Sequence, residues 1–338
     1  MADSVTRTGL RLRRCTVAIF APSPALTITV EPGSGDPEPE IHLHAGGQGF
    51  WVARMAARLG AEIDLCVPLG GETGEVLRPL LAVDGIGLRW IRVGGANGAY
   101  IHDRRSGERI EIAETASPPL TRHELDDLYG IALAAGLDAD LTLLTGPRNR
   151  GVLPPETYER LTRDLKENGR LVLADLSGEP LNAALRGGVD LIKASDQELR
   201  RAGTLEDDEI PAVVAAARRL REEGAANVLI SRGDRIAVAF VGDRLLGVRG
   251  PHFIPLDELG AGDSMFAGIG VALGSGFSIE DALRVGVAAG ALNVTRRGLG
   301  TGDPHEISEV ATQVKVTALE PDALEDRGDQ GPAAATAS

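Results

Sequence analysis

The chain has 338 residues, of which 43% are hydrophobic and 25% charged, and its formal net charge is −14. This balance is typical of a globular protein and excludes a wholly disordered chain. The acidic excess argues against a surface for nucleic acid or anionic membranes, because both would be repelled. It leaves room for a local basic pocket that binds a phosphate.

The N-terminal segment carries several arginines and then a short apolar run at residues 16–21, which could imitate a weak signal peptide. Pro22 and Pro24 close this brief run, so we interpret it as a first core strand. No stretch reaches the roughly 18 apolar residues that a membrane-spanning helix needs. Cys15 and Cys66 lie in apolar strand-like runs, where a buried thiol is the default, so we expect no disulfide framework. The sequence therefore predicts a cytoplasmic protein.

Short β-branched runs alternate with longer helical stretches rich in Ala, Leu and Arg along most of the chain. Several runs are continuously apolar, as expected for a parallel sheet that helices cover on both faces. This alternation predicts a doubly wound α/β fold. The predicted strands are Cys15–Phe20, Ile63–Pro68, Leu141–Leu144, Leu171–Ala174, Leu191–Lys193, Val228–Ser231 and Ile236–Val241. The predicted helices are Phe50–Leu59, Gly74–Ala82, Arg122–Ala135, Pro155–Asn168, Ile210–Glu223, Asp263–Leu273 and Ile279–Thr295.

Two segments, about 26–44 and 88–113, break this rhythm with strand-like alternation and no intervening helix. Period-two patterning predicts small, half-exposed antiparallel strands. They could form one small sheet that projects as a lid over a site at the strand ends, where open α/β folds bind ligands. A pair of surface hairpins is the other interpretation. The exposed edges and apolar face of such a sheet would favour a homodimer through the lid.

The last segment, residues 317–338, is rich in Asp, Glu, Pro and Ala and has almost no large apolar residues. Such a composition cannot bury enough apolar surface to fold, so we expect a disordered acidic tail. The single folded domain is then expected to span residues 1–316.

The most informative motif is Gly260-Ala261-Gly262-Asp263, which opens an Ala- and Gly-rich predicted helix. Small residues before a helix let backbone N–H groups converge on an anion, helped by the positive end of the helix dipole. Such a nest suits the charge on a phosphoryl group in transfer, and Asp263 could take the proton of an attacking hydroxyl. An ordinary helix start capped by Asp263 or Ser264 is the alternative. The glycines of Gly268-Ile269-Gly270 lie inside the predicted helix, which disfavours a dinucleotide fingerprint.

Six blocks between about residues 15 and 310 resemble the signatures of the ribokinase-like (PfkB) carbohydrate kinase family, in the same order and spacing. The stretch Leu259–Ser264 resembles its C-terminal signature, and Gly46-Gly47-Gln48-Gly49 resembles its N-terminal glycine signature. The central blocks are similar to the phosphofructokinase and tagatose-phosphate kinase branch. The other four blocks are Leu69–Gly74, Leu153–Pro155, Asp175–Glu179 and Leu191–Glu198.

The resemblance implies one large α/β domain with a β-sheet lid and an ATP-dependent kinase acting on a sugar, a sugar phosphate or a related ringed alcohol. Asp263 would be the catalytic base, and the backbone of Gly260–Gly262 the anion hole. Glu198 would organise Mg²⁺ through water, and Lys193 would approach the nucleotide phosphates. Magnesium keeps several waters, so few protein ligands are needed, and a monovalent cation would be compatible with the site. The other residues expected around the nucleotide are Ser195, Ser231, Gly233, Asn293, Gly298 and Gly300.

The acceptor side departs from the family pattern. Thr27 stands where the family has a carboxylate, and Gln48 and Trp51 stand where it has a lysine and an asparagine. Asn97 replaces an arginine before the lid strand. Amides cannot replace a charged bidentate contact to phosphate without substantial loss. The residues expected to contact the acceptor are Thr27, Gly46, Gly47, Gln48, Trp51, Asn97 and Arg148.

Two explanations of this divergence stay open. The pocket could be rebuilt for another acceptor, with Trp51 offering a flat ring face and Arg148 or Arg150 a new anion contact. Trp51 could equally be a core aromatic, and the two arginines could belong to a solvated loop. Alternatively, the protein binds nucleotide or sugar as a non-catalytic regulator. The intact Asp263 and its glycine motif favour a working enzyme.

Overall fold

A ten-stranded sheet forms the body of the protein in the computed structural model, which describes residues 12–33, 35, 38–83, 85–296 and 298–319. The sheet contains β1 (Thr16–Phe20), β4 (Glu62–Gly70), β5 (Ile86–Val93), β8 (Leu141–Thr145), β9 (Leu171–Asp175), β10 (Leu191–Ser195), β11 (Asn227–Ser231), β12 (Ala237–Val241), β13 (Arg244–Arg249) and β14 (Lys315–Ala318). Its order is β14-β13-β12-β11-β10-β9-β8-β1-β4-β5, parallel from β11 to β5 and antiparallel beyond β11. The predicted α/β class is thereby confirmed.

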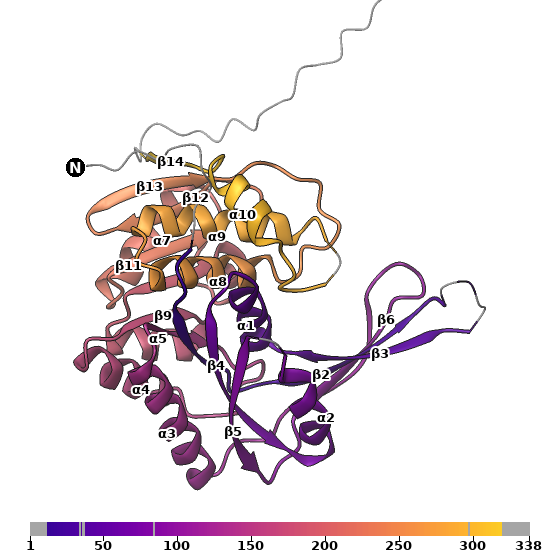
Figure 1. Cartoon of the computed structure of the whole chain (residues 1–338). Coiled ribbons are helices and arrows are strands. Elements are labelled where there is room, and N and C mark those ends of the chain that lie inside the picture. Colours follow the sequence, from indigo (N-terminus) through magenta and orange to yellow (C-terminus); the bar gives the residue numbers. More distant parts are fainter. Residues whose placement is uncertain (1–11, 34, 36–37, 84, 297, 320–338) are drawn as a thin grey trace, which may run out of the picture.

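A separate four-stranded sheet projects from the body as the predicted lid (Figure 1). It contains β2 (Ala25–Glu31), β3 (Glu40–Gly46), β6 (Gly98–Asp103) and β7 (Ile110–Thr115), in the order β3-β2-β6-β7. Two details of the prediction were wrong. Strand β5, from the segment 88–113, pairs with β4 in the main sheet, and β2 pairs with β6 in parallel. As an edge strand, β5 is only partly buried, so its sequence alternates as a lid strand would.

Helices cover both faces of the main sheet. One face packs against α1 (Gln48–Arg58), α2 (Gly71–Leu81), α8 (Ala261–Gly274), α9 (Ile279–Asn293) and α10 (Pro304–Ala311). The other packs against α3 (Arg122–Asp138), α4 (Glu156–Glu167), α5 (Gly178–Gly187), α6 (Asp196–Arg201) and α7 (Ile210–Glu222). The sequence patterns did not predict α5, α6 and α10, because helices this short give little periodic signal.

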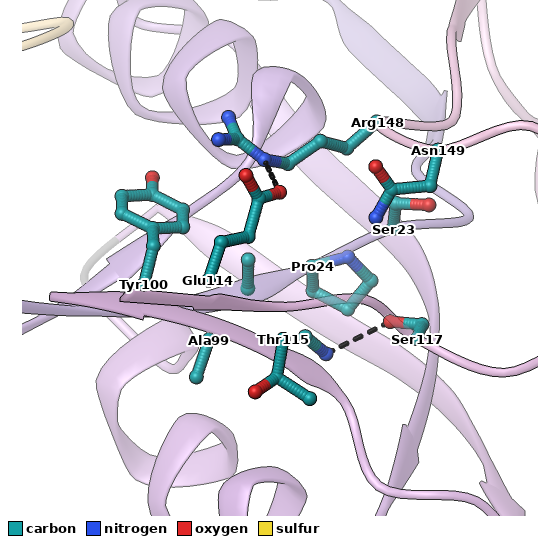
Figure 2. Close-up of a pocket in the computed structure, with 11 residues that line it drawn as sticks. Ser23, Pro24, Ala99, Tyr100, Glu114, Thr115, Ser117, Arg148 and Asn149 are labelled. Carbon is teal, nitrogen blue, oxygen red and sulfur yellow. Dashed lines mark hydrogen bonds and ion pairs between the residues drawn. The ribbon is translucent and has the colours of Figure 1, made fainter. Parts of the chain in front are cut away.

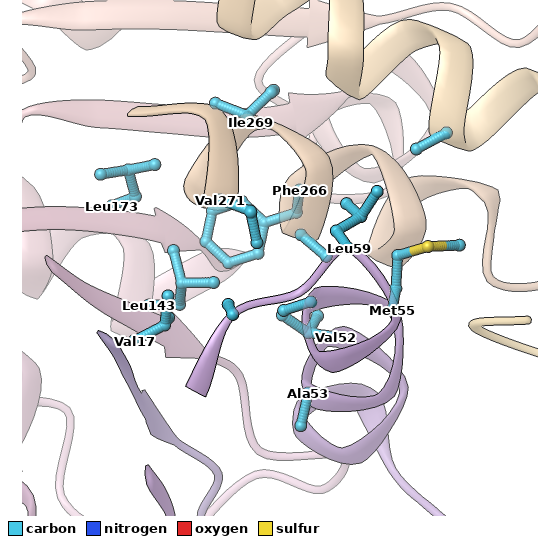
Figure 3. Close-up of a cluster of buried hydrophobic side chains, with 14 of the residues drawn as sticks. Val17, Val52, Ala53, Met55, Leu59, Leu143, Leu173, Phe266, Ile269 and Val271 are labelled. Atoms are coloured by element: carbon cyan, nitrogen blue, oxygen red, sulfur yellow. The ribbon is translucent and has the colours of Figure 1, made fainter. Parts of the chain in front are cut away.

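The central strand β1 explains why the apolar runs are continuous. Val17 and Ile19 belong to the core on the α8 side, whereas Ala18 and Phe20 belong to the core on the α3 side. Figure 3 shows Val17 near Phe266 of α8, with side chains of β8, β9 and α1 completing the cluster. The short apolar run near the N-terminus is therefore a buried central strand, as interpreted from the sequence.

Helices α8 and α9 approach closely through glycines. An added Cβ on Gly286 of α9 would stand 2.4 Å from Ile269 Cγ1 and 2.8 Å from the Met265 carbonyl oxygen of α8. On the facing helix, a Cβ on Gly268 would stand 3.0 Å from the Gly286 Cα. Gly268 thus serves helix packing rather than a nucleotide-binding turn. The close contact fixes α8, whose first turn carries Asp263.

The C-terminal boundary differs from the prediction. Thr317 and Ala318 belong to β14, and the Leu319 side chain is buried, so the folded part extends beyond residue 316. Pairing with β13 explains this, because it gives a short polar segment backbone partners that its composition does not reveal. The rest of the predicted tail, residues 320–338, lies outside the described residues. In the described part of the chain, no helix is long and apolar enough to cross a bilayer.

The helix contact can be tested by adding one methyl group. Gly286→Ala should lower the free energy of unfolding by about 1–3 kcal/mol, because backbone and Ile269 block the added atom. Gly130→Ala in α3 is the matched control, since nothing lies within 4 Å of its added Cβ. It should raise stability by about 0.5–1 kcal/mol through helix propensity alone. Urea denaturation measures both, and equal effects would contradict close packing at Gly286.

Candidate active site

A buried ion pair lies where β9 and β10 end. Asp175 is the last residue of β9 and is the register partner of Lys193 on β10. The Lys193 Nζ donates to Asp175 Oδ2 at 2.9 Å, and the two residues are 4% and 2% exposed. A charge this deeply buried needs a partner of opposite sign, because water no longer stabilises it. Each residue of the pair therefore requires the other.

The glycine motif packs directly on this pair. Gly260 caps the N-terminus of α8 with a left-handed φ of 76°, a conformation that suits glycine. A Cβ on Gly262 would stand 2.7 Å from Lys193 Nζ, so the ammonium lies against the first turn of α8. Asp263 is in the same turn. The structure thus brings together Gly262, Asp263 and Lys193, which the sequence analysis had placed in separate blocks.

Electrostatics in this cluster favour proton exchange near neutral pH. Burial raises the pKa of Asp263 to about 7, with Asp175 adding to the rise and Lys193 opposing it. Burial likewise raises the pKa of Asp175 to about 6, against the effect of Lys193. Burial alone would lower the pKa of Lys193, but Asp175 and Glu198 raise it above its usual value. The lysine therefore stays charged while Asp263 can gain or lose a proton.

Gln48, the first residue of α1, connects three elements at the site. Its Oε1 accepts from the Gly146 amide at 2.8 Å, just after β8, and its Nε2 donates to the Asp175 carbonyl oxygen at 3.3 Å. A hydrogen bond from Gln48 also lowers the pKa of Asp263. Gln48 was predicted to contact the phosphate acceptor, but both its Oε1 and its Nε2 form hydrogen bonds within the protein.

Ser195 and Glu198 form a capping box at the start of α6. The Glu198 Oε2 accepts from the Ser195 amide at 3.0 Å and from Ser195 Oγ at 2.7 Å. This arrangement satisfies amide groups at the helix start and holds Glu198 in place. Its charge acts on Lys193, Asp175 and Asp263, so Glu198 belongs to the same cluster.

Asn293, at the end of α9, organises the start of α8. Its Oδ1 accepts from Ser264 Oγ at 3.0 Å and from the Gly300 amide at 3.3 Å, and its Nδ2 donates to the Leu259 carbonyl oxygen at 2.8 Å. The side chain is buried. Asn293 thus ties the loop before the glycine motif to the loop that contains Gly300, a role that the sequence analysis had not assigned.

The other expected nucleotide residues lie on turns beside these elements. Ser231 ends β11, and its hydroxyl donates to the Ala194 carbonyl oxygen at 3.3 Å. Gly233 and Gly298 have φ values of 62° and 100°, and no described atom lies within 4 Å of an added Cβ on Gly233. Gly233 is therefore an open turn on which a ligand could approach the backbone.

The acceptor side lies between the lid and the body. A Cβ on Gly46 would stand 2.5 Å from Thr27 Oγ1 and 2.6 Å from the Tyr100 hydroxyl, so both hydroxyls crowd the end of β3. Gly47, which follows, has a φ of 99° and is the N-cap of α1. Trp51, on α1, is half-buried and packs against the main hydrophobic core.

Two further polar residues predicted for the acceptor side, Asn97 and Arg148, also bond within the protein. Asn97 is buried, its Oδ1 accepting from the Gly70 amide at 2.9 Å and its Nδ2 donating to the Pro68 carbonyl oxygen at 3.0 Å. Figure 2 shows Arg148 reaching from its loop to Glu114 of β7, with 2.6 Å between Nε and Oε1. The guanidinium also lies 4.6 Å from the centre of the Tyr100 ring.

Sequence analysis missed several residues of this site. Asp175 appeared only inside a resembling block, although an acidic residue directly after an apolar strand was a usable signal. Tyr100 and Glu114 had no signal, because only the lid pairing and the loop of Arg148 bring them to the site. Ser23 had one, since it begins the stretch Ser23–Thr27 that stands in place of the family's acceptor motif. Ser23, Tyr100, Glu114 and Arg148 line one pocket.

The chain is similar in sequence to known carbohydrate kinases. Residues 20–306 match the model of the pfkB family carbohydrate kinases. A 1-phosphofructokinase of Vibrio cholerae serotype O1 is 26% identical over 279 residues, which are 82% of this chain and 88% of that protein. The ATP-dependent 6-phosphofructokinase isozyme 2 of Escherichia coli K12 is 30% identical over 265 residues, 75% of this chain and 82% of that protein.

Solved structures show the same architecture. The crystal structure of a mutant of phosphofructokinase-2 from Escherichia coli superposes with a TM-score of 0.77 at 26% identity, covering 88% of this chain and 98% of that one. The predicted ribokinase-like fold with its small separate sheet is confirmed. Because the family model spans most of the chain, the protein belongs to the pfkB family of carbohydrate kinases.

Proposed function

We propose that this carbohydrate kinase transfers the γ-phosphate of ATP to a hydroxyl group of a sugar, a sugar phosphate or a related small ringed alcohol. The observation that carries the proposal is the position of Asp263, in a glycine-led helix start against the buried pair of Lys193 and Asp175. The relatives named as phosphofructokinases support the reaction class. A non-catalytic regulator is the alternative.

Asp263 would act as the general base. Its carboxyl pKa of about 7 lets it hold a proton taken from an acceptor hydroxyl and release it again near neutral pH. The amides of Gly260–Gly262 would stabilise charge on the transferred phosphoryl group, because first-turn amides of a helix lack intrahelical acceptors. Lys193, held against Gly262, would add a positive charge on the same side.

Lid closure would keep water out of the reaction. One observed contact joins the lid to the loop before the glycine motif. The Arg104 guanidinium, next to β6, lies 3.2 Å from Asp257 Oδ2, three residues before Gly260. The Leu259 amide donates to the other oxygen of Asp257 at 3.0 Å. The lid and the anion-hole loop therefore share a direct ion pair.

For the nucleotide, we propose that ATP lies along the turns with Ser231, Gly233, Gly298 and Gly300, beside Asn293, with Ser195 and Lys193 toward its phosphates. The cluster of Asp175, Glu198 and Asp263 around a single lysine carries excess negative charge, which fits a hydrated divalent cation. Glu198 would hold Mg²⁺ through water, and Mg²⁺ would neutralise the triphosphate. A monovalent cation is part of the same proposal.

We also propose that two copies associate through the outer face of the lid. Cross-strand register places Ile41 and Ile110 in one row and Leu43 in the next row of the same face. These side chains are exposed by 64%, 50% and 46%. Such an apolar face is normally covered by a partner.

The first prediction concerns the base. Asp263→Asn should lower acceptor-dependent ADP release about 10²–10⁴-fold, because the amide cannot accept the hydroxyl proton. Asp281→Asn is the matched control, since it removes a carboxylate from the first turn of α9 and should leave turnover unchanged. A coupled assay across sugars, sugar phosphates and nucleosides measures both. Full turnover by Asp263→Asn would contradict the proposed role of Asp263 as the base. If the parent protein binds ATP but turns over no acceptor, the result would favour a non-catalytic regulator.

The second prediction concerns pH. Because Asp263 must be ionised, kcat/KM should fall about tenfold per pH unit below about 7 and level off above it. The raised pKa also means that folding binds a proton, so the stability linked to Asp263 is present below its ordinary pKa of 3.8 and lost as pH rises through about 7. At pH 8, Asp263→Asn should therefore melt no lower than the parent protein. A pH-rate profile without a step near 7 would contradict this assignment.

The third prediction concerns assembly. Leu43→Glu should shift the protein from two chains to one in sedimentation equilibrium, because a charge would be buried in the proposed contact. Leu171→Glu is the control, since Leu171 is similarly exposed but starts β9 in the main sheet. Parent protein that sediments as a single chain at high concentration would refute the contact.

A further inference from the structure

Two buried hydroxyl groups of the lid lie close to Gly46, on the acceptor side. Thr27 on β2 and Tyr100 on β6 are register partners and are 8% and 2% exposed. Among the described residues, neither hydroxyl has a hydrogen-bond partner, and the same holds for Ser23 Oγ in the adjoining loop. A buried hydroxyl without a partner costs free energy, so three of them in one place indicate a surface that a ligand completes.

The lid residue Tyr100 offers its hydroxyl rather than its ring. Arg148 covers one side of the ring, 4.6 Å from its centre, and His102 meets it edge-on with 4.9 Å between ring centres. Figure 2 shows Tyr100 and Glu114 rising from the same side of the lid strands, toward Arg148. A ligand at this surface would therefore meet hydroxyl oxygens beside a paired guanidinium.

The charges around these hydroxyls are already balanced. Arg148 lies 2.6 Å from Glu114 and 3.6 Å from Glu111, so two carboxylates neutralise its charge. Gln48 and Asn97 stand where the family pattern has cations. The side-chain amides of both residues form hydrogen bonds with backbone groups. A phosphate here would meet acidic side chains and no uncommitted cation among these residues.

Farther out on the lid, the charges also cancel. Arg104 pairs with Asp257, and the Arg109 guanidinium donates to His102 Nδ1 at 3.1 Å. Burial lowers the pKa of His102 to about 4, so this histidine adds no positive charge at neutral pH. Arg104 pairs with Asp257 and Arg148 pairs with Glu111 and Glu114, whereas Arg109 contacts the neutral His102. The formal charges of these three arginines and three acids therefore sum to zero. A dianionic phosphate therefore gains little net attraction.

We propose that the acceptor of this kinase is an uncharged sugar or polyol, recognised through its hydroxyl groups by Ser23, Thr27 and Tyr100, and not a sugar phosphate. This inference rests on the proposed function and narrows its acceptor. Hydroxyl groups of a sugar donate and accept, so each can satisfy an unpartnered protein hydroxyl. The acidic partners of Arg148 would meanwhile disfavour the phosphorylated form of the same sugar.

The test compares each neutral sugar with its own phosphate ester. ADP release is measured with ribose and ribose 5-phosphate, fructose and fructose 6-phosphate, and fructose 1-phosphate. We expect kcat/KM for the best neutral member to exceed that of its ester at least tenfold. Preference for an ester would overturn this inference and leave the proposed kinase function standing.

Binding separates this inference from a failure of catalysis. The same pairs are titrated calorimetrically into Asp263→Asn protein with Mg²⁺ and a non-hydrolysable ATP analogue. Tighter binding of the neutral member supports the inference. Tighter binding of the ester, or no binding by any neutral member, overturns it even if no acceptor yields ADP.

Two substitutions test the hydroxyls themselves. Tyr100→Phe and Thr27→Val should each raise the KM for the neutral acceptor about tenfold and leave the KM for ATP and the melting temperature unchanged, because no described residue bonds to these hydroxyls. Tyr129→Phe is the matched control, since the Tyr129 hydroxyl bonds to Asp164 between α3 and α4. It should lower the melting temperature and leave both KM values unchanged. An unchanged acceptor KM in both lid variants would refute recognition by these hydroxyls.

Discussion

The buried ion pair of Lys193 and Asp175 is the interaction on which the rest of the site depends. Parallel pairing of β9 and β10 sets the two residues side by side, and burial makes their attraction strong and their separation costly. The first turn of α8 then packs on the ammonium at Gly262, where a side chain would collide with it. The position of Asp263 follows from this contact, because it is the next residue of the same turn.

The same pair sets the proton chemistry. Asp263 has its pKa raised toward neutrality by burial and by Asp175, and Lys193 limits the rise. If Lys193 stood alone, its charge would favour an ionised, weakly basic Asp263. If Asp175 stood alone, Asp263 would hold its proton more tightly. The balance between them gives a carboxylate suited to exchange a proton near pH 7, and Glu198 adds to it from the capped start of α6.

The sequence predicted those parts of the molecule that depend on local pattern. Apolar strands, long helices and the glycine-led start of α8 all have a periodicity or composition that identifies them. Strand β5 was misplaced, because an edge strand of a large sheet and a strand of a small sheet have the same half-exposed pattern. Non-local contacts had no signal at all: the ion pair of Arg104 and Asp257 joins residues 153 positions apart, and the bond from Ser264 to Asn293 joins two helices.

Gln48 shows why the two halves of the site are not independent. It stands where the family pattern has a lysine that would contact an acceptor phosphate, yet its Oε1 accepts from the Gly146 amide and its Nε2 donates to the Asp175 backbone. A lysine has no acceptor atom, so it would leave the Gly146 amide without its partner. It would also place a second cation beside Lys193, near the buried pair that positions Asp263. The amide therefore removes a charge from the acceptor side and at the same time fixes the ends of β8 and β9 around Asp263, the proposed base.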